Sequence, residues 1–196
     1  KTVTTKDWQV SVEAVTRKNF QWFFDQWVYR MGHPVFEATK QYDAAKNTLE
    51  LTLKQVQVPD SSNKFPVSNF FCGSMNIKID DRIEKVWIEA KAVNTFTFKL
   101  AAAPRLVNVD YESNWIKELS FSKTTEELLY SFLHDDDILA RKDALQKLAN
   151  VAKDSITNEA TKKTIIEALK AVITGNSYWR FRSSVLSQLQ AVTNAP

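Results

Sequence analysis

The spacing of apolar residues divides the chain into three parts. In residues 1–31, Thr4 and Asp7 stand in the S/T-x-x-D relation of a helix start, and apolar residues follow at helical spacing. Gly32 and Pro34 then favour the end of a second helix. That helix carries a stripe at positions i, i+3, i+4, i+7, i+8 and i+11, formed by Phe20, Phe23, Phe24, Trp27, Val28 and Met31.

The second helix is expected to be buried on more than one side. Trp22 and Tyr29 lie off the apolar stripe, so aromatic surface faces several directions. A short helix of this kind is typical of the interior of a larger body. The stripe is therefore expected to pack on a surface that this chain largely lacks, and to stay partly exposed in the isolated chain.

Residues 32–111 change to the alternating pattern of half-buried strands. Turn-forming residues occur at 43–47, 60–63 and 80–81. About six or seven short strands at this spacing indicate an antiparallel β-sandwich. The alternation is clearest in three runs, with apolar residues at Leu49, Leu51, Leu53, Met75, Ile77, Ile79, Phe96, Phe98 and Leu100.

Residues 112–196 return to helical spacing and contain an internal repeat. Thr124 and Glu127 form a capping box for the first helix. A helix-pair period of about 40 residues is typical of HEAT-like α-solenoids, and two pairs are few for a complete one. We therefore expect a truncated HEAT-like domain here, within a mixed α+β multidomain fold. An offset of 41 residues carries Arg141, Leu145 and Leu148 onto Arg182, Leu186 and Leu189.

The repeated positions suggest specific roles. Arg141 is expected to pair with the acidic run at 135–137, and Arg182 to face the turn at 176–177. The repeated leucines are expected to form the core of the helix pairs, with Leu→Ala costing about 2–5 kcal/mol.

The composition mainly excludes classes of function. The 196 residues are 44% hydrophobic, which is ample for a core, and the formal charge is only +3 without any basic block. We therefore expect neither nucleic-acid binding nor an anionic membrane partner, and no apolar run reaches the roughly 18 residues of a membrane span. The single cysteine excludes an internal disulfide. The sequence does not distinguish a cytoplasmic protein from a periplasmic or secreted one.

Candidate chemical residues are few. The two histidines, His33 and His134, lie far apart in sequence, and neither belongs to an H-E-x-x-H motif. Cys72 sits in an apolar strand-like setting, where cysteine is usually a small core residue. The acidic run at 135–137 lacks the spacing of a calcium loop and favours helix capping. We therefore expect no catalytic, metal or cofactor-binding residue on this chain.

Two aromatic groups suggest weaker alternatives. Trp87 with the pair Phe70 and Phe71 could form a sugar-stacking platform, although strand aromatics more often pack. The segment 178–182 combines aromatic and arginine residues, but no wider basic face supports RNA binding, and its fit to the repeat favours packing.

The segment FFDQWVYRMGHP, residues 23–34, resembles the hinge between the catalytic domain and the β-domain in zinc aminopeptidases related to aminopeptidase N and puromycin-sensitive aminopeptidase. The residues that carry this resemblance are Phe23, Phe24, Trp27, Gly32, His33 and Pro34. Weaker similarity extends over nearly the whole chain, including a Q-x-Q element at Gln55 and Gln57 and the segment PRLVNVD at 104–110.

The resemblance implies a domain plan of 1–31 as the helical end of a catalytic domain, 32–111 as a β-sandwich, and 112–196 as a HEAT-like repeat. Members of the family remove amino-terminal residues from peptides with a zinc ion held by two His and a Glu. Those motifs are missing here, so zinc is expected only in an absent catalytic domain of the same polypeptide. That domain and the peptide substrate are the partners that the resemblance implies.

The functional interpretation is a noncatalytic part that braces the catalytic domain and walls the substrate cavity. One alternative is a peptidase-like scaffold that lacks zinc activity and binds proteins on its solenoid. A second alternative is a carbohydrate-binding β-sandwich. Whether the chain belongs to an active enzyme is not decided by its sequence.

Overall fold

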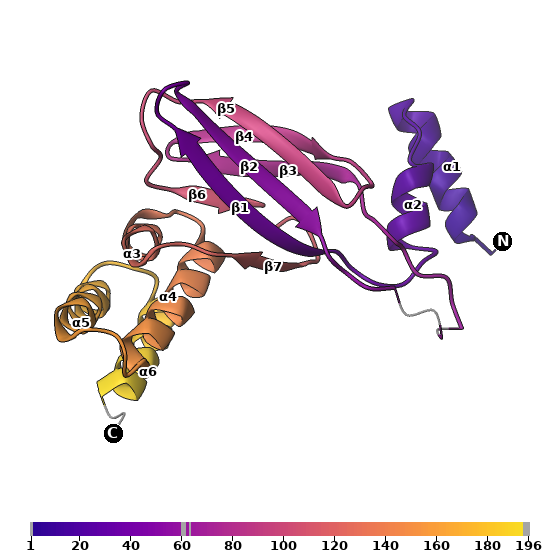
Figure 1. Ribbon diagram of the computed structural model, residues 1–196. Coiled ribbons are helices and arrows are strands. Elements are labelled where there is room, and N and C mark those ends of the chain that lie inside the picture. The colour runs from indigo at the N-terminus through magenta and orange to yellow at the C-terminus, as the bar shows by residue number, and fades with distance from the viewer. Residues whose placement is uncertain (1, 60–61, 63, 194–196) are drawn as a thin grey trace. The chain divides into compact units, whose positions relative to one another are not determined.

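The computed structural model describes residues 2–59, 62 and 64–193, and it confirms a mixed α+β multidomain fold (Figure 1). Within this part of the chain there are six helices and two sheets. The chain divides into two compact units, which are described separately below. Unit 1 contains Lys1–Met75, Lys85–Ala103 and Trp115–Phe121, and unit 2 contains Asn76–Glu84, Pro104–Asn114 and Ser122–Pro196.

Unit 1 begins with helices α1 (Thr5–Thr16) and α2 (Gln21–Trp27). The expected capping box is present, because the Thr4 side chain accepts from the backbone N–H of Asp7 while the Asp7 carboxylate accepts from the backbone N–H of Thr4. Helix α1 ends at Arg17, which adopts a left-handed conformation with φ 55°. The two predicted helices are therefore present, but α2 ends at Trp27 and not near Gly32 as predicted, so Val28 and Met31 lie beyond the helix.

A four-stranded sheet in unit 1 has the order β5-β2-β1-β7. Its antiparallel pairs align alternating apolar residues, for example Leu51 opposite Phe96 and Leu49 opposite Phe98. The strands are β1 (Val35–Asp43), β2 (Thr48–Gln55), β5 (Val93–Lys99) and β7 (Glu118–Phe121).

The pairing of β7 with β1 is parallel, whereas only antiparallel strands were expected. The two strands are joined by a long stretch of chain, as a parallel connection requires. With four residues, β7 is too short to show a period, so it did not stand out from the helical pattern beyond residue 112.

The second sheet has the order β4-β3-β6. A tight turn joins β3 to β4 at Asp80, which has φ 49°. The strands are β3 (Gly73–Ile79), β4 (Arg82–Ile88) and β6 (Val107–Val109). The turn expected at 60–63 lies outside the described residues, except for Ser62.

The core of unit 1 is built by the alternating residues of its strands and by one aromatic residue between β2 and β3. Phe71, in that connection, is fully buried. The other buried apolar side chains include Phe36, Ala38, Leu49, Leu51, Leu53, Met75, Ile88, Phe98 and Phe121.

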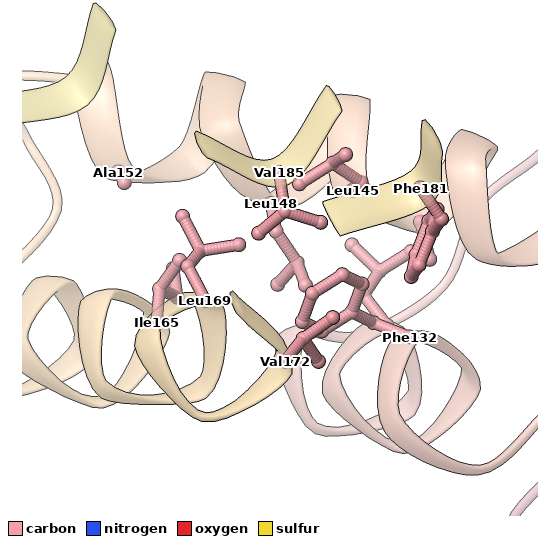
Figure 2. Packing of buried hydrophobic residues seen from close by; sticks show 11 residues of the cluster. Phe132, Leu145, Leu148, Ala152, Ile165, Leu169, Val172, Phe181 and Val185 are labelled. Carbon is pink, nitrogen blue, oxygen red and sulfur yellow. The ribbon is translucent and has the colours of Figure 1, made fainter. Parts of the chain in front are cut away.

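Unit 2 carries two helix pairs that share one core (Figure 2). Thr124 and Glu127 form the expected capping box of the first helix, and Asp137 caps the second. The helices are α3 (Thr125–His134), α4 (Ile138–Lys153), α5 (Glu159–Thr174) and α6 (Trp179–Thr193). The core side chains that Figure 2 labels are Phe132, Leu145, Leu148, Ala152, Ile165, Leu169, Val172, Phe181 and Val185.

Candidate functional site

Helix α2 and the hinge that follows it pack on residues of this same chain. The Trp27 ring lies 4.8 Å from the Phe71 ring and 5.8 Å from the Trp115 ring, measured between centroids. Phe24 is buried and meets the Trp8 ring edge-on at 5.2 Å. The expectation that the stripe lacks a packing surface is therefore wrong for its central residues. The expected partial exposure does hold, because Phe20, Phe23 and Trp27 are half-buried and Val28 and Met31 are exposed.

A glutamine on α2 binds the segment that leads into β3. Gln26 Nε2 donates to the Cys72 carbonyl at 2.6 Å, and Gln26 Oε1 accepts from the Cys72 N–H at 2.8 Å. Gln55, at the end of β2, makes the same two-way contact with Phe71, at 2.8 Å for each bond. Two side chains thus replace the strand that would otherwise pair with this buried backbone.

The three hinge residues after α2 join the helical region to the sheet. Gly32 has φ +98°, a conformation that favours glycine. His33 Nε2 lies 2.8 Å from Glu118 Oε1, and the Pro34 carbonyl accepts from the Glu118 N–H at 3.0 Å. The hinge residues named from the sequence therefore act as turn and pairing residues between α2, β1 and β7.

The proposed sugar platform is not formed as expected. Phe71 is fully buried, so it cannot present a face to a ligand. Trp87 is 44% exposed but meets Trp22 nearly perpendicularly, with ring centroids 5.2 Å apart. Stacking on a sugar needs an open flat face, so Phe71 cannot take part, whereas Trp87 and Phe70 remain partly exposed.

In unit 2, the acidic run at 135–137 is a capping and bridging group. Asp137 Oδ1 accepts from the N–H of Leu139, and Asp137 Oδ2 accepts from Asn108 Nδ2 at 3.2 Å. Asp135 also accepts from Asn108, and burial raises the pKa of the Asp135 carboxyl. The capping interpretation of this run is therefore confirmed.

The middle residue of the run binds a nearly buried lysine. Lys78 on β3 donates from Nζ to Asp136 Oδ1 at 2.5 Å and lies 4.9 Å from the centroid of the Tyr111 ring. Burial lowers the pKa of Lys78, but the hydrogen bond and charge of Asp136 outweigh it and leave that pKa raised. The same bond lowers the pKa of Asp136. Alternation along β3 assigned Lys78 to the solvent face, so the sequence did not indicate this contact.

Each of the two repeated arginines donates to a backbone carbonyl. Arg141 Nε donates to the Phe132 carbonyl at 2.9 Å, and Arg182 Nη1 donates to the Gly175 carbonyl at 3.1 Å. Each arginine thus binds a carbonyl near the end of the preceding helix. Of the acidic run, Asp135 acts on Arg141 through its charge, and the Phe181 ring lies 4.4 Å from the guanidinium.

The repeated leucines are not equivalent. Leu145 and Leu148 are buried, and Leu189 packs at the margin of the same core. Leu186 is 44% exposed, although it matches Leu145 in the repeat and was expected in the core. Tyr178 and Trp179, expected to pack, are also exposed.

Of the remaining candidates for chemistry, His134 lies against the Tyr130 ring, with ring centroids 4.6 Å apart. Among the described residues, no three His, Cys, Asp or Glu side chains are grouped to hold a metal ion. Burial raises the pKa of the Cys72 thiol, which disfavours the thiolate that a nucleophile needs. None of the described helices has the length and apolar character to cross a bilayer.

Surface hollows occur among the described residues of unit 2. The first, of about 430 Å³, is lined mainly by apolar atoms of α3, together with Arg105, whose guanidinium lies 4.1 Å from the Tyr130 ring centroid. The second, of about 490 Å³, lies along α5 and includes the ends of α4 and α6. Its rim carries four lysines and two glutamates, whereas Glu126, Glu127 and His134 also line the first hollow.

No protein-family model matches the chain, and comparison with curated proteins found no match. Among solved structures, the chain is similar to aminopeptidase A of Legionella pneumophila, solved in complex with aspartic acid. The TM-score is 0.66 at 14% sequence identity, and the match covers 98% of this chain and 25% of that chain. The chain spans about a quarter of that protein, and its fold is aminopeptidase-like.

Proposed function

We propose that this chain is a noncatalytic structural part of a zinc aminopeptidase of the aminopeptidase N type. Its role is to brace the catalytic domain and to help wall the cavity that receives the peptide. The observation that carries the proposal is the fold likeness to an aminopeptidase over 98% of this chain. The hinge-like segment at 23–34 supports the same interpretation independently.

The packing of the hinge suits a bracing role. The Trp27 ring packs against the rings of Phe71 and Trp115, and the Gln26 side chain hydrogen-bonds to the backbone of Cys72. Helix α2 is thus fixed to the strands by both apolar and hydrogen-bonded contacts. A catalytic domain attached to α1 and α2 would be held by a stiff connection.

The zinc chemistry belongs, in this proposal, to a catalytic domain of the same polypeptide. There a zinc ion and a glutamate base would activate water for cleavage of amino-terminal residues from peptides. We therefore assign no catalytic or metal-binding role to His33 or His134.

Metal and activity measurements test this division of roles. The purified chain, washed with chelator and reconstituted with zinc, should hold no stoichiometric zinc and should not hydrolyse aminoacyl arylamides. One tightly bound zinc per chain that is lost in His33→Ala or His134→Ala would overturn the proposal.

The coding sequence on the amino-terminal side of Lys1 provides a second test. An H-E-x-x-H motif followed by a further glutamate supports the peptidase assignment. A peptidase-like sequence with those ligands replaced would instead favour the protein-binding scaffold.

A further inference from the structure

One exposed face of α3 lines the first of the hollows in unit 2. The hollow has a volume of about 430 Å³ and is lined by Glu126 and Glu127 from the first turn of the helix and by His134 from its end. Its lining is mostly apolar between these ends. A volume of this size falls within the range of about 300–1,000 Å³ that is typical of small-molecule sites.

An apolar row of the helix forms one side of the hollow. Leu129 and Leu133 are four residues apart and are therefore neighbours on the surface of α3. Leu129 is half-buried against the core of the helix pairs, and Leu133 is 38% exposed. An aliphatic group that enters the hollow would contact both side chains and leave water on this side.

The neighbouring row of α3 carries an aromatic ring with a cation beside it. Tyr130 and His134 are also four residues apart, and their ring centroids are 4.6 Å apart. The Arg105 guanidinium lies 4.1 Å from the centroid of the Tyr130 ring. Because this ring already has two flat neighbours, the hollow favours a flexible aliphatic ligand over an aromatic ligand that would need a ring to stack on.

The Arg105 guanidinium is available to an anion. Among the described residues, it contacts the Tyr130 ring and pairs with no carboxylate. The glutamates of the hollow instead serve the start of the helix. Glu127 Oε2 accepts from the Thr124 N–H at 3.0 Å, and hydrogen bonds from its own backbone and from Thr124 lower the pKa of Glu126. The hollow therefore has carboxylates at one end and a guanidinium with unused donors farther along the helix.

We propose that this hollow binds a free carboxylate with an unbranched aliphatic chain, of the class of medium-chain fatty acids. The carboxylate binds the Arg105 guanidinium, whose planar fork can hold both oxygens, and the His134 ring lies beside it. The chain lies over Leu129 and Leu133. Charge complementarity carries the argument, because an anion with an apolar tail satisfies both rows of the helix at once. The proposal stands on unit 2 alone and does not depend on a peptidase role.

Calorimetric titration of the full chain with submicellar carboxylates tests the proposal. A single octanoate should bind per chain. From hexanoate to decanoate the affinity should rise by about fourfold for each added CH₂ group, which is the change expected when one such group is buried. Octanol and octylammonium have the same chain without the negative charge, and they should bind more weakly than octanoate by about tenfold or more.

Three variants at exposed positions make the result specific. Arg105→Gln should weaken octanoate binding by about tenfold or more and leave octanol binding unchanged. Leu133→Gln should reduce the gain in affinity per CH₂ group while the preference for a carboxylate remains. Arg180→Gln is the matched control, because the Arg180 guanidinium also lies over an aromatic ring, that of Trp179, but does not line the hollow. This variant should bind octanoate as the wild type does.

Several results would overturn the proposal. One is the absence of octanoate and decanoate binding, or binding that begins only when micelles form. Another is equal binding of octanoate and octanol, or equal effects of Arg105→Gln and Arg180→Gln. Dimerisation of the chain that is abolished by Leu133→Gln would also overturn it, because the hollow would then be covered by a second copy.

Discussion

Gln26 and Gln55 bind neighbouring residues of one backbone segment. The Gln26 amide pairs with Cys72 in both directions, and the Gln55 amide pairs in both directions with Phe71. Both glutamines are almost completely buried. Because a buried backbone group without a partner is costly, each glutamine substitutes for a missing strand.

Replacing Gln55 with Leu should therefore destabilise the protein strongly. Leucine fills a similar volume but leaves the Phe71 N–H and carbonyl without partners, at about 1–3 kcal/mol for each group. Gln26→Leu should have a comparable effect through Cys72. Urea unfolding measures both changes, and Gln41→Leu on the exposed side of β1 serves as the matched control. A loss at Gln55 no larger than at Gln41 would contradict this role.

Gly73 should tolerate no side chain. Its φ of +152° is rarely adopted by other residues, and a Cβ there would lie 3.0 Å from Trp115 Cζ2. Trp115 is itself held by a hydrogen bond from Nε1 to the Ser74 carbonyl at 2.9 Å. Gly73→Ala should cost more than about 1 kcal/mol. Thermal unfolding should show a smaller effect for Gly175→Ala, where φ is −82° and the cost is limited to a Cβ that lies 3.1 Å from the Ala171 carbonyl oxygen.

In the helical repeat, truncation of Leu145 and of Leu186 should lower the free energy of unfolding by unequal amounts. Leu145→Ala should cost about 2–5 kcal/mol, because Leu145 is buried in the core. Leu186→Ala should cost less than about 1 kcal/mol, because much of that side chain is already in water. Urea unfolding of the two variants provides the comparison. Similar losses at both positions would mean that Leu186 is covered in solution.

The arginine pair should also be unequal, with Arg141 more important. Arg141→Ala removes a hydrogen bond to the Phe132 carbonyl and the stacking on Phe181, whereas Arg182→Ala removes the bond to Gly175. Cation–π stacking is worth about 0.5–2 kcal/mol, and this sets the expected difference. Arg141→Lys should recover only part of the loss, since lysine lacks the planar group. Thermal unfolding of the three variants checks the order.

Sequence patterns predicted the helices and strands well, because the interactions that start and end these elements join residues close in sequence. The capping boxes at Thr4 and Thr124 and the alternation in β2 depend on residues close in sequence, and the structure contains them. The repeat offset correctly aligned the starts of α4 and α6.

Contacts between distant residues were not predictable in the same way. The Gln26 contact with Cys72 spans 46 residues, and the bond from Lys78 to Asp136 spans 58. Neither contact produces a periodic pattern in the sequence, because a single polar residue between apolar neighbours is predicted to face solvent. Leu186 shows the opposite case: it matches the buried Leu145 in the repeat, yet its own side chain is 44% exposed.

The ion pair between Lys78 and Asp136 should make stability depend on acid pH. The hydrogen bond from Lys78 lowers the pKa of Asp136 below its ordinary value of 3.8. A carboxylate with a lowered folded pKa stabilises the protein above its ordinary pKa, and this contribution is lost as pH falls through the folded value.

Asp135 affects the pH dependence of stability in the opposite sense. Its pKa is raised by burial, so its favourable contribution is present below the ordinary value and is lost as pH rises through the folded value.

Asp136→Asn separates the two effects. At neutral pH the variant should be less stable by more than about 1 kcal/mol, because it leaves the nearly buried Lys78 ammonium without its anionic hydrogen-bond partner. The difference from wild type should shrink below pH 3.8 as Asp136 of the wild type becomes protonated. Urea unfolding from pH 7 to pH 2.5 measures it. Asp143→Asn, which removes an exposed pair with Lys147, should change stability by only about 0.3–0.5 kcal/mol. A pH-independent difference between wild type and Asp136→Asn would show that the carboxylate charge is not what stabilises Lys78.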